Sequence, residues 1–333
     1  MTDLRGRVSD FNAFPAYAWN TVRNSTLGGR TLFITGASGF AGSWLLAAIA
    51  KLNARLAAPI KVRALSRVAR ESTDPWLTWV QGDVREFRDD ARADVILHAG
   101  LSSEATPDGG DAELRDTAVR GMERILAHAK ASGATRLLVL SSGAVYGTTA
   151  GPVAETTAVG ALDPTDIYAI AKREVEAAAQ AAAGSSLEVA VARLFTCIGP
   201  GYRNHGHLAH VSLIDDARAK RPLNLRSDGK AIRSYLYGAD LAVWLLTLLG
   251  AKGNDVVNVG SDVPMTVLAF AQRVSRAAGR THEPVVTGHA RTTLRPCFVP
   301  DIARARSRYS LAPWTTVELA ISRTLSAGTQ ETK

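Results

Sequence analysis

The chain has 333 residues, 46% of them hydrophobic, which suffices for one large α/β domain or two smaller ones around a buried core. Its two cysteines, Cys197 and Cys297, stand far apart without metal-ligand spacing, so the sequence predicts structural thiols in a reducing cytoplasm and no disulfide framework. The net charge is +8, but the basic residues are scattered, which argues against a nucleic-acid partner and favours a small anionic substrate. No segment has a signal-peptide pattern or the ~18 apolar residues of a membrane span, so no membrane partner is expected.

Residues 1–30 form an arm that carries several aromatic residues and ends after Gly28-Gly29. We expect this arm to pack as a short helix on the body of the protein or on a partner subunit. Apolar, β-branched runs then alternate with helical patterns. The predicted strands are 31–35, 61–65, 94–99, 136–142 and 188–195, and the predicted helices include 44–52, 111–131 and 168–183.

The predicted strands are continuously apolar, which is typical of a parallel sheet covered on both faces. Their alternation with helices predicts an α/β fold with a Rossmann-type doubly wound parallel sheet. From about residue 197, loops rich in Gly and Pro interrupt this rhythm before a further helix and strand at 238–249 and 255–259. We therefore expect an N-terminal arm (1–30), an NAD(P)-binding domain (31–196 plus 236–261) and a smaller C-terminal substrate-binding lobe (197–235 plus 262–333).

A glycine loop with a GxxGxxG pattern follows the first strand and opens a helix. Glycine at 36 permits a tight turn, glycine at 39 lets the backbone approach a pyrophosphate, and glycine at 42 allows close packing of the helix on the sheet. The N-terminus of that helix then faces the phosphate charge. The expected cofactor contacts of this segment are Gly36, Ser38, Gly39, Phe40 and Gly42.

The adenosine end of the cofactor is read by residues after the next strands. An acid at the end of the second strand accepts the ribose hydroxyls of NAD, whereas a neutral residue with an arginine suits the 2′-phosphate of NADP. Here the strand ends in Ser66-Arg67, which favours NADP. Asp83 is placed either to contact the adenine or to cap the following turn. The remaining expected cofactor contacts are Val84, Ala99 and Gly100.

A pair of residues suited to proton transfer lies on the predicted helix 168–183. Tyr168 and Lys172 are four residues apart and therefore share one helix face. A nearby ammonium stabilises a phenolate, so we expect Lys172 to lower the pKa of Tyr168 from about 10. Ser142 ends what is the fourth predicted strand, at the sheet edge where parallel sheets bind ligands, and its hydroxyl is placed to hold the substrate oxygen.

Taken together, these residues resemble the extended short-chain dehydrogenase/reductase superfamily, in particular its NAD-dependent nucleotide-sugar epimerases and dehydratases. The resemblance runs from about residue 31 to about 325 and matches the glycine loop, Asp83, Ser142, Tyr168 and Lys172. It implies NAD as cofactor, a nucleotide-diphosphate sugar as substrate, and Ser142, Tyr168 and Lys172 as the catalytic residues. It also implies a homodimer formed through helices 112–130 and 168–183, with burial of these helices on the sheet as the alternative.

The resemblance extends to the predicted substrate lobe. Residues 193–200 are similar to the family pattern RxxNxxGP, with Thr196 where an asparagine usually contacts the substrate. Residues 229–240 resemble GxxxRDxxxVxD, which implies that Arg233 binds the diphosphate and that Arg291 is its second clamp, although either can be a surface ion-pair residue. The loop 201–230, with His205, His207, His210 and Arg226, is expected to line the sugar pocket without catalytic histidines.

The residues after Ser142 separate the possible reactions. In the 4,6-dehydratases of the family an Asp-Glu pair follows the catalytic hydroxyl residue, and in the decarboxylases a Glu takes the second place. This chain has Gly143 and Ala144, which transfer no proton, so dehydration and decarboxylation are disfavoured. The leading interpretation is 4-epimerisation through a transient 4-keto sugar, and the second is NADPH-dependent reduction of a 4-keto sugar. An inactive cofactor-binding scaffold is disfavoured because Ser142, Tyr168 and Lys172 are all present.

Overall fold

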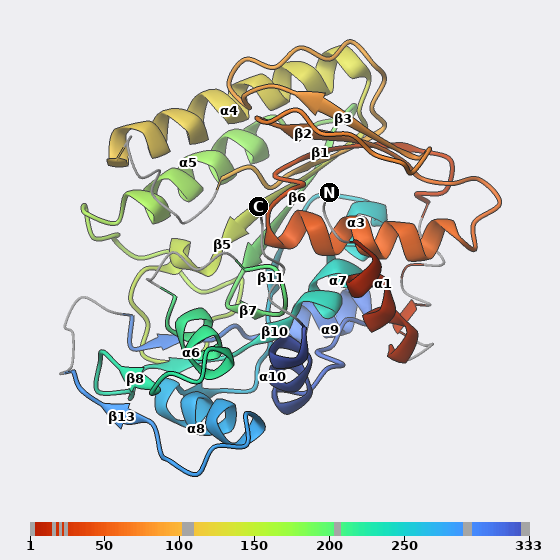
Figure 1. The fold of residues 1–333 in the computed structure, drawn as a ribbon. Coiled ribbons are helices and arrows are strands. Elements are labelled where there is room, and N and C mark those ends of the chain that lie inside the picture. Colours follow the sequence, from red (N-terminus) through yellow and green to blue (C-terminus); the bar gives the residue numbers. More distant parts are fainter. Residues whose placement is uncertain are drawn as a thin grey trace.

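The computed structural model describes residues 4–14, 18–19, 22, 26–101, 110–202, 208–288 and 295–327. Its centre is a seven-stranded sheet in which each neighbouring pair of strands is parallel (Figure 1). The strand order is β11-β6-β5-β4-β1-β2-β3. This arrangement confirms the predicted doubly wound α/β fold. The strands are β1 (Thr31–Thr35), β2 (Lys61–Ser66), β3 (Leu77–Gln81), β4 (Val95–His98), β5 (Arg136–Ser142), β6 (Glu188–Leu194) and β11 (Asp255–Val259).

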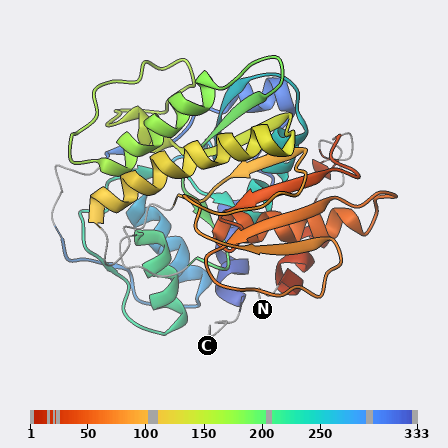
Figure 2. The ribbon, with the colours of Figure 1, turned by 90° about the horizontal axis from the view of Figure 1, so that it is seen from above.

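Helices cover both faces of this sheet (Figures 1 and 2). On one face lie α3 (Phe40–Asn53) and α7 (Gly238–Gly250), and on the other lie α4 (Gly110–Ser132) and α5 (Ile167–Ala181). Successive residues of a strand serve opposite faces, since Leu32 belongs to the apolar cluster around α3 and Phe33 to the cluster around α4. Double burial is the reason that the strands read as continuous apolar runs.

The direction of winding reverses between β1 and β4. Strands β2 and β3 continue from β1 toward one edge, and β5, β6 and β11 continue from β4 toward the other. The loops that follow β1 and β4 therefore diverge at their carboxyl ends, which is where open α/β sheets bind ligands.

Two elements differ from the sequence expectation. Strand β3 was not predicted, because this edge strand mixes buried and exposed positions and lacks a continuous apolar run. Ser142 therefore ends the fifth strand of the chain, and not the fourth. The segment expected to form loops after residue 197 contains α6 (Ala209–Arg218), whose buried face includes His210.

The segments after β6 add short strands and helices beside the carboxyl edge, which is the side of the sheet where its parallel strands end. The opposite side, where the strands begin, is the amino edge. Helices α6, α8 and α10 pack on one another, and β9 pairs with both β12 and β14. Because β11 returns to the main sheet beside β6 before the chain leaves the sheet again, the chain crosses between the two parts three times. The exact domain boundaries stay a prediction. These elements are β7 (Cys197–Ile198), β8 (Asn224–Leu225), β9 (Ile232–Arg233), β10 (Leu236–Tyr237), β12 (Met265–Thr266), α8 (Val267–Ala277), β13 (Val285–Val286), β14 (Cys297–Phe298), α9 (Ala303–Tyr309) and α10 (Val317–Ser326).

The described part of the arm packs on the body of the protein, as one of the two expected arrangements. Helix α1 (Leu4–Asp10) and the short turn η1 (Phe11–Ala13) lie against α3. Phe11 packs edge-on against Trp44, and the hydroxyl of Tyr237 donates a hydrogen bond to Asp10 at 2.8 Å. Both cysteines are buried free thiols. Among the described helices, none has the length and apolar character needed to cross a membrane.

Candidate active site

The glycine loop after β1 takes its shape from two of its three glycines. Gly36 has a φ of 69°, and a Cβ there would lie 2.3 Å from the carbonyl oxygen of Ala99. A Cβ on Gly42 would lie 2.4 Å from the carbonyl oxygen of Gly36, so this glycine packs α3 against its own loop and not directly against the sheet. Gly39 is exposed, and a Cβ there would meet only the Gly36 oxygen at 3.2 Å. Gly36 and Gly42 thus fix the loop, while Gly39 leaves its outer side open.

The start of α3 fits the pyrophosphate of a dinucleotide. Gly39 is its N-cap residue, no described side chain caps its N-terminus, and its first turn contains no acidic residue. The first amides of the helix therefore face outward beside the partly buried Ser38, with the positive end of the helix dipole behind them. The ring of Phe40 stacks on Tyr202 with centroids 3.9 Å apart. Ala99 and Gly100, from the end of β4, border the same loop because the Gly36 site is in contact with both.

At the end of β2, Ser66 and Arg67 have different environments. Ser66 is buried, and its hydroxyl donates to the carbonyl oxygen of Val68 at 2.8 Å and accepts from Arg70 at 3.1 Å. Arg67 is exposed. The strand therefore ends in a neutral serine and not in a carboxylate, and two arginines, Arg67 and Arg70, follow it in the sequence.

Asp83 caps the turn after β3, as one of its two expected roles. Its carboxylate accepts hydrogen bonds from the backbone and the guanidinium of Arg85, both at 2.9 Å. The Arg85 guanidinium holds the pKa of Asp83 below its usual range and also pairs with Asp116 of α4 at 3.0 Å. Val84 packs against Gly121 of the same helix, where a Cβ would lie 3.1 Å away. These contacts tie the loop to α4; contact of Asp83 with the adenine stays a prediction.

The three residues expected to carry the chemistry lie together at the carboxyl edge. Ser142 is the last residue of β5, where its hydroxyl accepts a hydrogen bond from the amide of Ala144 at 3.1 Å and acts on the pKa of Tyr168 in the first turn of α5. The Nζ atom of Lys172 lies 5.6 Å from the centroid of the Tyr168 ring. Asp166 caps α5 by accepting a hydrogen bond from the amide of Ala169 at 3.1 Å. The cap and the strand end together fix the position of the tyrosine.

The pKa of Tyr168 differs from the sequence expectation. Burial raises the pKa of Tyr168 to about 12, although the Ser142 hydroxyl acts in the opposite direction. The expected lowering by Lys172 is not found. Its ammonium instead donates to the carbonyl oxygens of Leu140 and Leu101 at 2.8 and 3.4 Å. Burial lowers the pKa of Lys172 itself to about 8. In this state desolvation outweighs the charge of the lysine.

Two charged residues near Tyr168 were not found from the sequence. Arg295 forms an ion pair with Asp166, and its positive charge lowers the pKa of Tyr168. Asp166 could have been found, because an aspartate directly before a helical pattern is a common N-cap. Arg295 could not, because 129 positions separate it from Asp166.

His98 lies behind this group and is neutral. It is buried at the end of β4, and its Nδ1 atom is hydrogen-bonded to the hydroxyl of Thr35 at 2.9 Å. Burial and the charge of Lys172 lower the pKa of His98 to about 3. It therefore adds no charge beside the lysine at neutral pH.

The expected substrate residues lie in the segments after β6. Arg233 is partly buried on β9, and burial lowers its pKa, to which the nearby charge of Arg295 adds. Thr196 lies between β6 and β7, and its carbonyl oxygen accepts from the amide of Leu236 at 3.0 Å. His210 is buried in α6, and not in a loop, with its pKa lowered to about 4 by burial. Arg291, His205 and His207 lie outside the described residues.

The position after Ser142 is closed to a larger side chain. A Cβ on Gly143 would lie 2.6 Å from the ring of Phe195, and Ala144 is buried. An aspartate at 143 would need this ring to move. The packing therefore agrees with the lack of a second acid or base at this place.

Comparisons with known proteins match most of the described sheet and the candidate site. A family model described as the NAD dependent epimerase/dehydratase family matches residues 32–260. The uncharacterized UDP-glucose epimerase YtcB of Bacillus subtilis is 25% identical over 165 residues, which are 49% of this chain and 51% of that protein. UDP-glucuronic acid decarboxylase 1 of Arabidopsis thaliana is 26% identical over 63% of this chain and 49% of its own length. A UDP-glucuronate 4-epimerase of Thermodesulfobacterium geofontis is 22% identical over 63% of this chain and 64% of its length. The matched part thus spans about half of the first two of these curated relatives.

Solved structures share the fold. A structure of MoeE5 in complex with UDP-glucuronic acid and NAD has a TM-score of 0.74 and 22% identity, over 89% of this chain and 97% of that one. The UDP-glucose 4-epimerase of Thermotoga maritima, with UDP-glucose, has a TM-score of 0.75 and 18% identity over the same shares. At these identities the likeness is one of fold.

Proposed function

The chain belongs to the NAD dependent epimerase/dehydratase family, and from this premise we propose that it catalyses the 4-epimerisation of a nucleotide-diphosphate sugar through a transient 4-keto intermediate. The observation that carries the proposal is that the end of β5 and the first turn of α5 bring Ser142 and Tyr168 to the carboxyl edge, with no acid or base in the two positions after Ser142. Epimerisation needs one proton-transfer group and a cofactor that takes a hydride and gives it back. Dehydration needs a further acid and base, for which Gly143 and Ala144 leave no group.

In this proposal each residue has a defined task. NAD, when bound on the glycine loop, supplies reversible hydride transfer at the reacting carbon. Tyr168 takes the proton of the sugar 4-hydroxyl and later returns it, and Ser142 holds that oxygen by a hydrogen bond. Lys172, fixed by the carbonyl oxygens of Leu140 and Leu101, is a cation beside the nicotinamide ribose. The three groups come from β5 and α5, whose positions the sheet fixes.

We propose a UDP-sugar as the substrate, with a hexuronate or a hexose as the sugar. The support is that the relatives named above are described as enzymes of UDP-glucose or UDP-glucuronate. Arg233 is the proposed diphosphate ligand, because a guanidinium offers a planar fork of donors to phosphate oxygens. Arg291 is its proposed second clamp and Thr196 a proposed sugar contact.

A second candidate function is the NADPH-dependent reduction of a 4-keto sugar. The observation that favours it is the buried neutral Ser66 at the end of β2, next to Arg67 and hydrogen-bonded to Arg70. A reductase exchanges its cofactor in each cycle, whereas an epimerase retains it. The two candidates therefore differ in how tightly the dinucleotide is held.

Identification of the ligands that copurify with the protein tests both candidates. The protein is denatured, and the released dinucleotide and any nucleotide sugar are identified by mass spectrometry. Tightly held NAD+ together with interconversion of two UDP-sugars supports the epimerase. If the protein purifies without dinucleotide and consumes added NADPH when a 4-keto sugar is supplied, the epimerase is rejected in favour of the reductase. If the protein binds cofactor but converts no nucleotide sugar, both candidates are contradicted, and the result supports an inactive cofactor-binding scaffold.

We further propose a homodimer that forms through α4 and α5. Both helices cover one face of the sheet, and the proposal rests on the resemblance stated above. Light scattering should give about twice the chain mass of 35.3 kDa. A mass equal to that of one chain rejects the dimer.

A further inference from the structure

We infer that Arg295 is a second cation of the catalytic centre, which Asp166 holds beside Tyr168, and that this ion pair sets how readily Tyr168 gives up its proton. The inference rests on the proposed role of Tyr168 as the proton-transfer group. Arg295 acts in it through Tyr168 and is therefore a positioning residue.

The chain fixes Arg295 from its C-terminal side. Arg295 lies two residues before β14, which pairs in parallel with β9 so that Phe298 lies opposite Arg233. The carbonyl oxygen of Cys297 also accepts a hydrogen bond from the hydroxyl of Thr149 at 3.1 Å. The segment after Arg295 is thus tied both to the strand of Arg233 and to the loop that leads toward α5.

Asp166 fixes the guanidinium itself. One carboxylate oxygen of Asp166 caps α5 at the amide of Ala169, and the other pairs with Arg295. Asp166 lies two residues before Tyr168, so the arginine is held at the start of the helix turn that carries Tyr168. Both partners are 27% exposed, which places the pair at the boundary between protein and solvent and not in the core.

The charged groups around Tyr168 come from three directions. Lys172 follows on the same helix and is bonded to two backbone carbonyl oxygens. The charge of Glu176 raises the pKa of Lys172, and burial together with the charge of Lys172 keeps His98 neutral. Among the described residues, the charges that shift the pKa of Tyr168 are those of the pair itself: Arg295 lowers it and Asp166 raises it. Arg233 on β9 adds a further positive charge near Arg295.

The chemical consequence follows from the charge that develops in the reaction. Tyr168 carries negative charge when it acts as a base, and burial makes that charge costly. A cation held at the rim stabilises the phenolate, while the carboxylate that holds the cation works against it. The two members of the pair therefore have opposite effects on the tyrosine, although they share a single contact.

This opposition gives a test that separates electrostatic control from simple support. Arg295→Met removes the positive charge at similar length, Arg295→Lys retains a positive charge, and Asp166→Asn removes the negative charge but keeps an N-cap. We expect Arg295→Met to raise the pKa of Tyr168 by about one unit, a tenfold smaller phenolate fraction at a given pH, and Asp166→Asn to lower it by a smaller amount. Arg295→Lys should stay near the wild-type value.

The readout is a carbon-13 NMR titration of ring-labelled tyrosine on the full chain with NAD+ bound, in which Tyr168→Phe identifies the resonance. Shifts of opposite sign in Arg295→Met and Asp166→Asn support the inference. Shifts of the same sign, or no shift in either variant, mean that the pair is only a structural contact and overturn it. Thermal unfolding checks that each variant is folded.

A second readout is the pH dependence of sugar conversion. The rate should rise with pH as Tyr168 loses its proton. The midpoint of this rise should move in the same direction as the pKa from NMR in each variant. If no sugar is converted by the wild-type protein, the proposed function fails, while the NMR titration still decides whether the ion pair controls Tyr168.

Discussion

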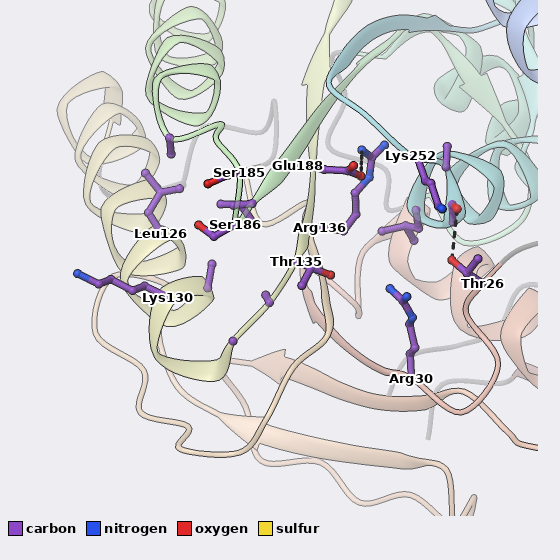
Figure 3. Close-up of a pocket in the computed structure, with 18 residues that line it drawn as sticks. Thr26, Arg30, Leu126, Lys130, Thr135, Arg136, Ser185, Ser186, Glu188 and Lys252 are labelled. Carbon is purple, nitrogen blue, oxygen red and sulfur yellow. Dashed lines mark hydrogen bonds and ion pairs between the residues drawn. The ribbon is translucent and has the colours of Figure 1, made fainter.

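The two edges of the seven-stranded sheet carry charged residues in different surroundings. At the carboxyl edge, α3 and α5 begin beside the glycine loop, Ser142 and Tyr168. At the amino edge, α4, α5 and α7 end around an open cavity of about 910 Å³, which Figure 3 shows with four basic residues on its walls. These residues are Arg30, Lys130, Arg136 and Lys252.

The basic residues of the amino edge include cations that neutralise helix ends. Arg136 is buried and donates to the carbonyl oxygens of Leu248 and Gly253 at the end of α7, and Lys130 lies in the last turn of α4. Positive side chains at helix C-termini stabilise the partial negative charge there. This cavity thus lies where the helices end, whereas the candidate catalytic residues lie where they begin. Parallel strands with right-handed crossovers impose this separation, because all connecting helices run in one direction relative to the sheet.

The largest difference between the edges should appear in turnover. Tyr168→Phe removes the proton-transfer group, and we expect the conversion of nucleotide sugar to fall by about 10²–10⁴-fold with cofactor binding retained. The matched amino-edge variant is Lys252→Ala, which should leave turnover unchanged. A similar loss in both variants would contradict the assignment of the chemistry to the carboxyl edge.

Two glycines with positive φ test how tightly each edge is packed. Gly36 at the carboxyl edge and Gly133 at the amino edge have φ values of 69° and 74°, but only Gly36 is crowded, since a Cβ at Gly133 meets nothing within 4 Å. Gly133→Ala should lower the free energy of unfolding by about 1–2 kcal/mol from backbone conformation alone. Gly36→Ala adds an overlap with backbone atoms and should cost several kcal/mol more or prevent folding. Urea denaturation measures both, and equal losses would show that the loop yields without cost.

A buried cation at the amino edge should matter for stability and not for catalysis. Arg136→Met leaves the carbonyl oxygens at the end of α7 without their charged donor, so we expect a loss of about 2 kcal/mol in the free energy of unfolding. Lys130→Met, on the exposed side of the cavity, should change it by less than about 0.5 kcal/mol. Turnover at a temperature where both variants are folded should equal that of the wild type. A fall in turnover for Arg136→Met but not for Lys130→Met would show that Arg136 at the amino edge affects the catalytic residues at the carboxyl edge.

An effect of similar size, visible only when the pH is changed, is expected from His98 at the carboxyl edge. Its pKa in the folded state, about 3, is below its unfolded value of about 6.5, so its contribution to stability is fully present above pH 6.5 and is lost as the pH falls toward 3. Between about pH 7 and pH 5 this loss amounts to about 2 kcal/mol. His98→Asn keeps a partner for the Thr35 hydroxyl without the titration. The difference between wild type and variant in urea midpoints should therefore shrink or reverse at the lower pH, and a difference independent of pH would contradict the neutral His98.

Much of the fold and the predicted catalytic trio followed from local patterns. The run Thr31–Thr35, the glycine loop and the strand that ends at Ser142 carry signals within a few residues, since a strand buried on both faces must be apolar throughout. Tyr168 and Lys172 share a helix face by spacing alone. The sequence patterns did not predict edge strand β3 or helix α6. Strand β3 is only half-buried, and α6 follows a segment with several glycines and a proline.

The sequence by itself determined the sheet, the loop and which groups can transfer a proton, because these depend on residues close in the chain. Only the tertiary structure decided how those groups behave. It placed Arg295 on Asp166 across 129 positions, closed the space beside Gly143 with Phe195, and directed Lys172 toward backbone carbonyl oxygens while burial raised the pKa of Tyr168. Burial and charge depend on every group that surrounds an atom in space, and a pattern of residue types along the chain does not contain that arrangement.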